Sequence, residues 1–227
     1  MTVNDLRAQI SKIDGWQTDN EINFLFKTAK HCSGKGVIVE IGSWKGKSTI
    51  CLALGSKAGR RVPIYAIDPH TGAPEHHAIF QTKNIWTFDE FKKNIHEAGV
   101  EDIVRPIVGR SEDVAKTWNE PIEFLWIDGA HAYESALLDF ESWYPYLIDG
   151  GVIAYHDVIG EVKKVVKEKI LLSENFRNCG LVDLIAFGTK SALPISRWQK
   201  LRNRRILFWI NLVDFFRDLP LPKVVRP

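Results

Sequence analysis

Residues 37–48 read VIVEIGSWKGKS, and this stretch decides how the rest of the chain is interpreted. The β-branched, apolar run at 37–41 carries Glu40 and predicts a buried strand. A glycine turn follows, and a helix is expected to begin at Ser48. A strand, a glycine turn and a helix in this order are typical of a site that holds a nucleotide-like ligand against a helix N-terminus.

The alternation of strands and helices continues along the chain. Further apolar runs predict strands at 62–68, 103–108, 124–128, 152–155 and 184–187, the last paired in a hairpin with 176–179. Apolar residues at helical spacing predict helices at 48–56, 88–98, 112–118, 133–147 and 162–171, and an earlier helix that starts with a capping box from Thr18 to Glu21. This pattern predicts a parallel sheet with helices on both faces, whose ligands bind at the carboxyl ends of the strands.

Polar residues gather at those carboxyl ends. They are Glu40, Asp68, Gly109 with Ser111, Asp128, and His156 with Asp157. Asp68 closes the second strand, where an acid can accept hydrogen bonds from both hydroxyls of a ribose. That interpretation predicts a nucleoside ligand, whereas the alternative is that Asp68 only caps the turn after it.

The turn after the first strand is also close to a phosphate loop. Its sequence GSWKGKS is one residue shorter than the phosphate-loop pattern GxxxxGK[ST], which alters the ring of N–H groups that would enclose a phosphate. The dinucleotide pattern GxGxxG is absent too, because Trp44 stands at the second glycine. A P-loop-like nucleotide-binding protein therefore stays open as an alternative.

Composition and charge narrow the class of protein. The 227 residues are 45% hydrophobic and 26% charged, as is ordinary for a globular protein. A net charge of +2 does not indicate a nucleic-acid partner. Three cysteines without CxxC spacing argue against a disulfide framework or a zinc finger. Neither a signal-peptide core nor a run of about 20 apolar residues is found, so we expect a cytoplasmic protein.

Four segments carry a resemblance to a known family. They are EIGSWKGKST at 40–49, YAIDPH at 65–70, IVGRSEDV at 107–114 and FLWIDGAHAYESALLDFESWYPYLIDGGVIAYHDV at 124–158. Together they resemble class I S-adenosylmethionine-dependent methyltransferases, closest to methyltransferase family 24, which is related to macrocin-type and catechol-type O-methyltransferases and to cephalosporin-hydroxylase-like proteins. The resemblance covers roughly residues 21–190. It implies a Rossmann-like, doubly wound α/β fold with a mostly parallel seven-stranded sheet and an antiparallel last strand.

The resemblance also implies a role for each residue at the strand ends. The cofactor-binding residues are Glu40, Gly42, Ser43, Gly46 and Ser48 for the methionine part of S-adenosyl-L-methionine, Asp68 for the ribose, Gly109, Arg110 and Ser111 for the adenine, and Asp128 beside them. The metal ligands are Asp128, His156 and Asp157. The catalytic residues are His131, where relatives hold a base, and Asp128.

This placement suits the chemistry of methyl transfer. The acceptor oxygen must be aligned with the methyl group and must lose its proton during attack. A divalent metal, Mg²⁺ or Mn²⁺, would lower the acceptor pKa, and His131 could take the proton. His156 departs from the acid that several metal-dependent relatives carry, and imidazole suits Mn²⁺ better than Mg²⁺. Alternatively, His156 and Asp157 form a hydrogen-bonded strand end, and His131 only orients the substrate.

Two helical appendages are expected around a catalytic domain. We predict an N-terminal helical cap at 1–36, the methyltransferase domain at 37–193 and a basic, aromatic C-terminal appendage at 194–227. Within the domain, the polar stretch 69–87 contains three histidines and predicts a substrate lid, with a metal cluster as the alternative.

The C-terminal stretch from Ile195 to Leu219 reads as one helix with basic residues at its front. It has three alternative roles: packing on its own domain, forming a homodimer, or lying on an anionic membrane surface.

The predicted function is methylation of a small hydroxylated metabolite or sugar, which would be the partner molecule. Besides the phosphate-loop alternative, a non-methylating hydroxylase-like enzyme or a scaffold protein could use the same fold, because a fold does not fix an activity.

Overall fold

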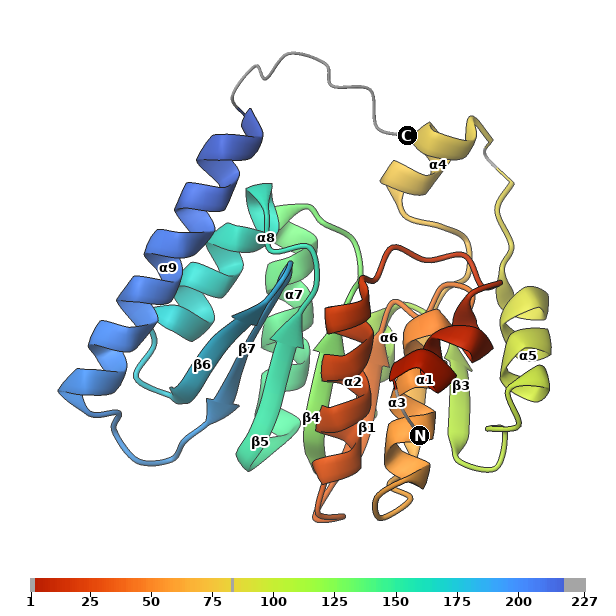
Figure 1. Ribbon diagram of the computed structural model, residues 1–227, viewed down its shortest axis with the longest axis horizontal. Coiled ribbons are helices and arrows are strands. Elements are labelled where there is room, and N and C mark those ends of the chain that lie inside the picture. Colours follow the sequence, from red (N-terminus) through yellow and green to blue (C-terminus); the bar gives the residue numbers. More distant parts are fainter. Residues whose placement is uncertain (1–2, 83, 219–227) are drawn as a thin grey trace.

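A single sheet organises the part of the chain that the computed structural model describes, residues 3–82 and 84–218 (Figure 1). The strands are β1 (Val37–Ile41), β2 (Ile64–Asp68), β3 (Val104–Val108), β4 (Ile122–Ile127), β5 (Leu147–Tyr155), β6 (Phe176–Val182) and β7 (Ile185–Lys190). Their order is β3-β2-β1-β4-β5-β7-β6. Strands β1 to β5 run parallel, and β7 is antiparallel to both β5 and β6. The expected seven-stranded Rossmann-like sheet with a reversed last strand is confirmed.

Helices cover both faces of the sheet. They are α1 (Val3–Ile10), α2 (Asp19–His31), α3 (Lys47–Lys57), α4 (Pro74–Phe80), α5 (Phe88–Glu97), α6 (Ser111–Ala115), α7 (Tyr133–Trp143), α8 (Gly160–Val165) and α9 (Arg197–Asp218). Apolar side chains of α1, α2, α3 and α5 share one core with the sheet, and those of α6, α7, α8 and α9 share the other. The capping box from Thr18 to Glu21 is present at the start of α2, as predicted.

The order in which the chain adds strands reverses at β1, which pairs in parallel with β2 on one side and with β4 on the other. The connections from β1 and β4 therefore leave toward opposite faces, and a crevice opens between them at their carboxyl ends. All five residues of β1 are buried, which explains why this strand is apolar on both faces apart from Glu40.

Three predicted segments differ from the structure. The helix expected at 133–147 ends at Trp143, because Pro145 lacks the N–H that would continue it, and a 3₁₀ turn at Tyr144–Tyr146 follows. Strand β5 then begins at Leu147, so the paired glycines at 150 and 151 lie inside the strand and do not end a helix. The stretch 69–87, expected to be irregular, contains α4.

Helices α2 and α3 pack closely where Gly55 faces the backbone of α2. A Cβ atom at Gly55 would lie 2.2 Å from the carbonyl oxygen of Phe26. We expect Gly55→Ala to lower the free energy of unfolding by roughly 2 kcal/mol, because this clash outweighs the better helix propensity of alanine. Urea denaturation measures the change. Gly109→Ala is the control, since its new methyl group would meet only the Val114 side chain, at 3.4 Å. A Gly55→Ala variant as stable as the wild type would contradict the close packing.

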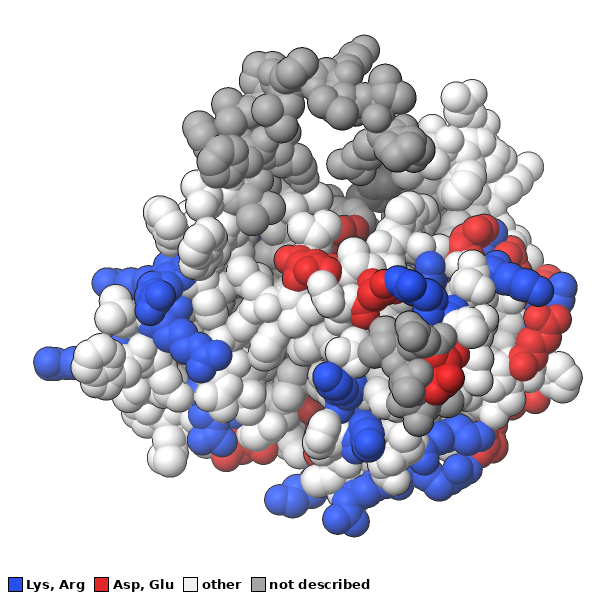
Figure 2. Space-filling model, viewed as in Figure 1, with Lys and Arg blue, Asp and Glu red and all other residues white. Residues whose placement is uncertain are grey.

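No helix among the described residues is long and apolar enough to cross a membrane. Charged side chains are spread over the face drawn in Figure 2, and basic ones lie at its left edge, where Figure 1 places α9, and along its lower edge. Residues 219–227 of the predicted C-terminal appendage lie outside the described residues.

Candidate active site

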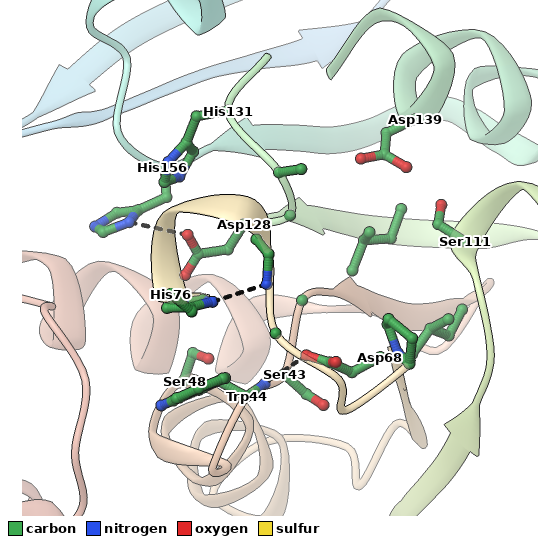
Figure 3. A pocket seen from close by; sticks show the side chains of 18 of the residues that line it. Ser43, Trp44, Ser48, Asp68, His76, Ser111, Asp128, His131, Asp139 and His156 are labelled. Atoms are coloured by element: carbon green, nitrogen blue, oxygen red, sulfur yellow. Dashed lines mark hydrogen bonds and ion pairs between the residues drawn. The ribbon is translucent and has the colours of Figure 1, made fainter. Parts of the chain in front are cut away.

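A cavity of about 530 Å³ opens at the carboxyl ends of β1, β2, β4 and β5 (Figure 3). The predicted site residues that line it are Gly42, Ser43, Ser48, Asp68, Arg110, Ser111, Asp128, His131, His156 and Asp157. The N-terminal segment 14–17 and the segment 71–73 with His76 complete its wall. The structure therefore brings most of the predicted cofactor, catalytic and metal residues to one place.

Three predicted cofactor residues do not line the cavity: Glu40, Gly46 and Gly109. Glu40 is buried behind it and accepts hydrogen bonds from Ser48, at 2.5 Å, and from Thr49. Burial raises the pKa of Glu40 to about 8, against the opposing effect of these hydrogen bonds. Glu40 thus fastens the first turn of α3 to β1.

The glycine turn after β1 has a strict steric requirement at Gly42. Its φ is +85°, and a Cβ atom there would lie 2.1 Å from the carbonyl oxygen of Asp128. Only glycine lets the ends of β1 and β4 approach this closely. The next residue, Ser43, lines the cavity, and its buried hydroxyl has no hydrogen-bond partner among the described residues. Such a group fits a site that receives a polar ligand.

Asp68, at the end of β2, is held in a fixed orientation. Its Oδ2 accepts a hydrogen bond from the backbone N–H of Trp44 at 2.7 Å, and its Oδ1 accepts one from that of His70 at 2.6 Å. Asp68 therefore does cap its turn. A carboxylate has about four lone-pair sites, so Asp68 can still accept hydrogen bonds from two ribose hydroxyls in the cavity that it lines.

His156, at the end of β5, is buried among three acids. Its Nδ1 lies 3.0 Å from Oδ1 of Asp128 and 3.5 Å from Oδ2 of Asp157, and its Nε2 lies 3.3 Å from Oε2 of Glu21. Burial alone would lower the pKa of His156, but the charge of Asp128, its hydrogen bond and the ion pair with Glu21 raise the pKa to about 11. The three surrounding acids therefore favour the imidazolium form of the ring.

A second possible metal set shares two members with the predicted one. Asp128, His131 and Asp157 are the described residues whose ligand atoms converge, all within 4.8 Å of one another. His131 is partly exposed, and its Nε2 lies 3.5 Å from Oδ2 of Asp157. His156, the third predicted ligand, lies beside this cluster with its ring against Asp128 and Glu21.

An aromatic wall, made of Trp16, Trp44, His76 and Phe80, rises beside the cavity. The rings of Trp44 and His76 stack with centroids 4.1 Å apart, and those of Trp16 and His76 stack at 5.5 Å. Three separate segments supply these rings: 14–17, the turn after β1, and α4. Helix α4 is thereby held against the mouth of the cavity, where a substrate lid was predicted.

The three histidines of the predicted lid point to different partners. The ring of His70 is buried and lies 2.9 Å from the Thr87 hydroxyl, and the ring of His77 lies 2.8 Å from the carbonyl oxygen of Thr82. No metal-ligand cluster in the described part of the chain includes any of them. The alternative metal cluster at 69–87 therefore finds no support.

Comparison with known proteins identifies the family. A family model described as a methyltransferase domain matches residues 39–158, more than half of the 227 residues. The chain belongs to this methyltransferase family. The resemblance noted in the sequence is confirmed, and the fold is that of class I S-adenosylmethionine-dependent methyltransferases.

Solved structures share the methyltransferase fold at low sequence identity. The O-methyltransferase NovP is 17% identical with a TM-score of 0.65, over 76% of this chain and 80% of that one. An O-methyltransferase from Bacillus cereus, solved in complex with SAH, is 20% identical with a TM-score of 0.57, over 83% and 89%. TomG from Streptomyces achromogenes, an O-methyltransferase solved in complex with SAM, is 16% identical with a TM-score of 0.58, over 84% and 88%.

The backbone of the glycine turn argues against a phosphate loop in this methyltransferase. The N–H of Gly46 donates to the carbonyl oxygen of Ser43 at 2.8 Å, and the N–H of Trp44 donates to Asp68. In a phosphate loop such N–H groups would surround the phosphate. The side chain of Lys47 is also not directed at a phosphate position, because its Nζ donates a hydrogen bond to the carbonyl oxygen of Gly15 at 2.9 Å.

Several residues of the methyltransferase site were missed by sequence reasoning. Gln17 donates from Nε2 to Oδ2 of Asp128 at 3.0 Å, and Glu21 pairs with His156. No local signal marks either, since both reach the site from the N-terminal segment. Asp139 of α7 also lines the cavity, and burial raises its pKa to about 6, against a hydrogen bond from Ser111. Its place in the segment 124–158, which carries the resemblance, was the available signal.

Proposed function

We propose that this methyltransferase binds S-adenosylmethionine and methylates a hydroxyl group of a small acceptor. The observation that carries the proposal is the meeting of Asp68, the Gly42–Ser43 turn and Asp128 in one cavity. The solved relatives in complex with SAH and SAM share the fold and support the choice of cofactor.

The cavity offers suitable groups for each part of that cofactor. Asp68 is the proposed ribose ligand, and the buried hydroxyl of Ser43 is available to the amino-acid part. Arg110 and Ser111 lie at the start of α6, where the adenine is proposed to bind. When bound, S-adenosylmethionine supplies an electrophilic methyl group on its sulfonium centre.

His131 is the proposed acceptor of the substrate proton. It lines the cavity, and its Nε2 lies 3.5 Å from a carboxylate oxygen of Asp157, which is the arrangement expected of a histidine that acts as a general base. Asp157 would orient the ring and stabilise its protonated form. Asp128 faces the same space and fixes the imidazolium of His156 beside it.

Metal assistance is a second form of this proposal, favoured by the convergence of Asp128, His131 and Asp157. These residues would hold a divalent ion, and their mixture of imidazole and carboxylate suits Mn²⁺ better than Mg²⁺. His131 cannot bind a metal and accept a proton at the same nitrogen. Treatment with a chelator separates the two forms: lost transfer that Mn²⁺ restores supports the metal, and unchanged transfer supports His131 as the base.

The acceptor is proposed to be a small hydroxylated metabolite or sugar with a flat, partly apolar face. The rings of Trp16 and Trp44 line the cavity and offer a surface against which such a face can stack. The wall carries the side chain of Phe80 as well, which is 49% exposed.

Isothermal titration with S-adenosylhomocysteine tests the cofactor assignment. We expect the wild type to bind and Asp68→Ala to bind about 30-fold to 100-fold more weakly, because a fixed acceptor for the ribose hydroxyls is lost. Asp113→Ala is the matched control, since Asp113 is an exposed acid on α6 that pairs with Lys116. The assignment is refuted if the wild type gives no heat of binding, or if Asp68→Ala binds as tightly as the control.

A further inference from the structure

The outer face of α9, outside the active site, carries four exposed large apolar side chains. Its buried face carries Asn203 and Ile210, and Ile206 packs partly against the core. Residues at the same helical spacing on the opposite side of α9 face outward. They are Trp198, Leu201, Arg205, Phe208 and Trp209, of which the four apolar ones are 81%, 51%, 62% and 55% exposed.

Basic residues surround these apolar side chains. Between residues 197 and 212 the chain has five basic residues and no Asp or Glu. They are Arg197, Lys200, Arg202, Arg204 and Arg205. Figure 2 shows basic side chains at the left edge of the drawn face, along α9. The whole molecule has a net charge of only +2, so this concentration of positive charge is local.

We infer that α9 docks the protein on an anionic lipid surface. An interfacial helix places Trp, Phe and Leu side chains at the boundary between headgroups and acyl chains, while Arg and Lys contact anionic headgroups. The exposed face of α9 combines both groups. Its 22 residues suit a helix that lies along the surface, and it is not apolar enough to cross the bilayer.

Charge decides between a membrane and a second copy of the chain as the occupant of this face. Two copies that met through α9 would bring two sets of five basic residues together, which is unfavourable. Lys200 is already paired with Glu174. An anionic lipid surface attracts the other four, and each basic residue near such a surface strengthens binding about fivefold. The exposed aromatic side chains then gain burial that the folded chain itself does not give them.

Vesicle sedimentation with the full-length protein tests this docking. We expect binding to vesicles of phosphatidylcholine with about 30% phosphatidylglycerol, which gives them an anionic surface. Binding to vesicles of phosphatidylcholine alone should be weak. Raising the salt concentration to about 0.5 M should weaken the binding, because it screens the charges.

Two variants of α9 separate the apolar and basic contributions. Trp198→Ser combined with Phe208→Ser, and Arg202→Glu combined with Arg205→Glu, should each weaken vesicle binding at least about tenfold. The matched control is Lys92→Glu combined with Lys93→Glu, which makes the same change in charge on the exposed surface of α5 and should leave binding unchanged. All substituted residues are exposed, and circular dichroism verifies that each variant is folded.

Three results would overturn the inference. The first is absence of binding to the anionic vesicles, and the second is equal binding by the wild type and both α9 variants. The third is a dimer in light scattering that the α9 variants dissociate, because the face would then be occupied by a second copy. Binding of S-adenosylhomocysteine is measured independently, so failure of the docking inference leaves the proposed function unaffected.

Discussion

Replacing Glu21 with alanine should lower the free energy of unfolding by about 3–5 kcal/mol, as expected when one partner of a buried ion pair is removed. Glu21 is 1% exposed and lies 3.3 Å from the ring of His156. Its other carboxylate oxygen accepts a hydrogen bond from the N–H of Leu184 at 3.0 Å, which ties α2 to the turn between β6 and β7. The alanine variant leaves a buried imidazolium with one fewer counter-charge and a backbone N–H without its acceptor.

Urea denaturation at several pH values measures this effect and its origin. The pKa of His156 is raised from 6.5 to about 11, by Asp128 and Glu21 against the opposing effect of burial. The folded state therefore holds a proton that the unfolded state releases, and the stabilisation is complete below about pH 6.5 and is lost as pH rises toward 11. Burial alone would raise the pKa of Glu21, but the interaction with His156 and hydrogen bonds from the backbone lower the pKa. The stabilisation that the Glu21 carboxylate gives is therefore lost as pH falls and the carboxylate is protonated.

A shallower loss of stability between pH 6.5 and 11 is thus expected for Glu21→Gln, which keeps the shape of the side chain and removes its charge. Asn20→Ala is the matched control, because Asn20 is the exposed neighbour of Glu21 and its side chain donates hydrogen bonds to the Asp183 carboxylate. The ion pair would be unimportant if Glu21→Ala and Asn20→Ala had the same stability at pH 6.

Replacing Asp128 with asparagine should lower kcat for methyl transfer by roughly 10²-fold to 10⁴-fold. The substitution keeps the shape of the side chain. It removes the charge that faces His156 at 3.0 Å, and Nε2 of Gln17 loses its carboxylate acceptor. The lost charge stands at the end of β4, where His131 and Asp157 also converge. The loss therefore affects the reaction both if these residues handle a proton and if they hold a metal ion.

Release of S-adenosylhomocysteine measures this loss, with the acceptor that the wild type uses in a screen of phenols and sugars. Asp113→Asn is the control, because it also removes the charge of one acid, at an exposed position on α6. Full turnover by Asp128→Asn would remove Asp128 from the catalytic residues. A variant with normal S-adenosylhomocysteine affinity and low turnover would assign the effect to the transfer step.

The fold was predictable because its signals are local. The central strands are apolar runs, and Gly42, Asp68 and Asp128 stand at the ends where a parallel sheet places its ligands. The errors were local too. Pro145 stops α7 in a sequence whose apolar spacing continues, and the glycines after Leu147 lie inside a strand.

The roles of the site residues were less predictable, because they depend on contacts between distant segments. The sequence places His156 among polar strand ends but cannot show that Glu21, from α2, lies against its ring. That contact raises the pKa of His156, and His131 lies beside Asp128 and Asp157. Gln17 and Trp16 reach the cavity from the N-terminal segment, which was predicted to be only a cap.

A crystal structure of the protein with saturating S-adenosylhomocysteine is the decisive measurement for the proposed cofactor site. We expect a nucleoside in the cavity, with its ribose hydroxyls on the carboxylate of Asp68 and its amino-acid part near Ser43. A cavity that stays empty in such crystals, or a nucleoside bound away from Asp68, would refute the proposed site.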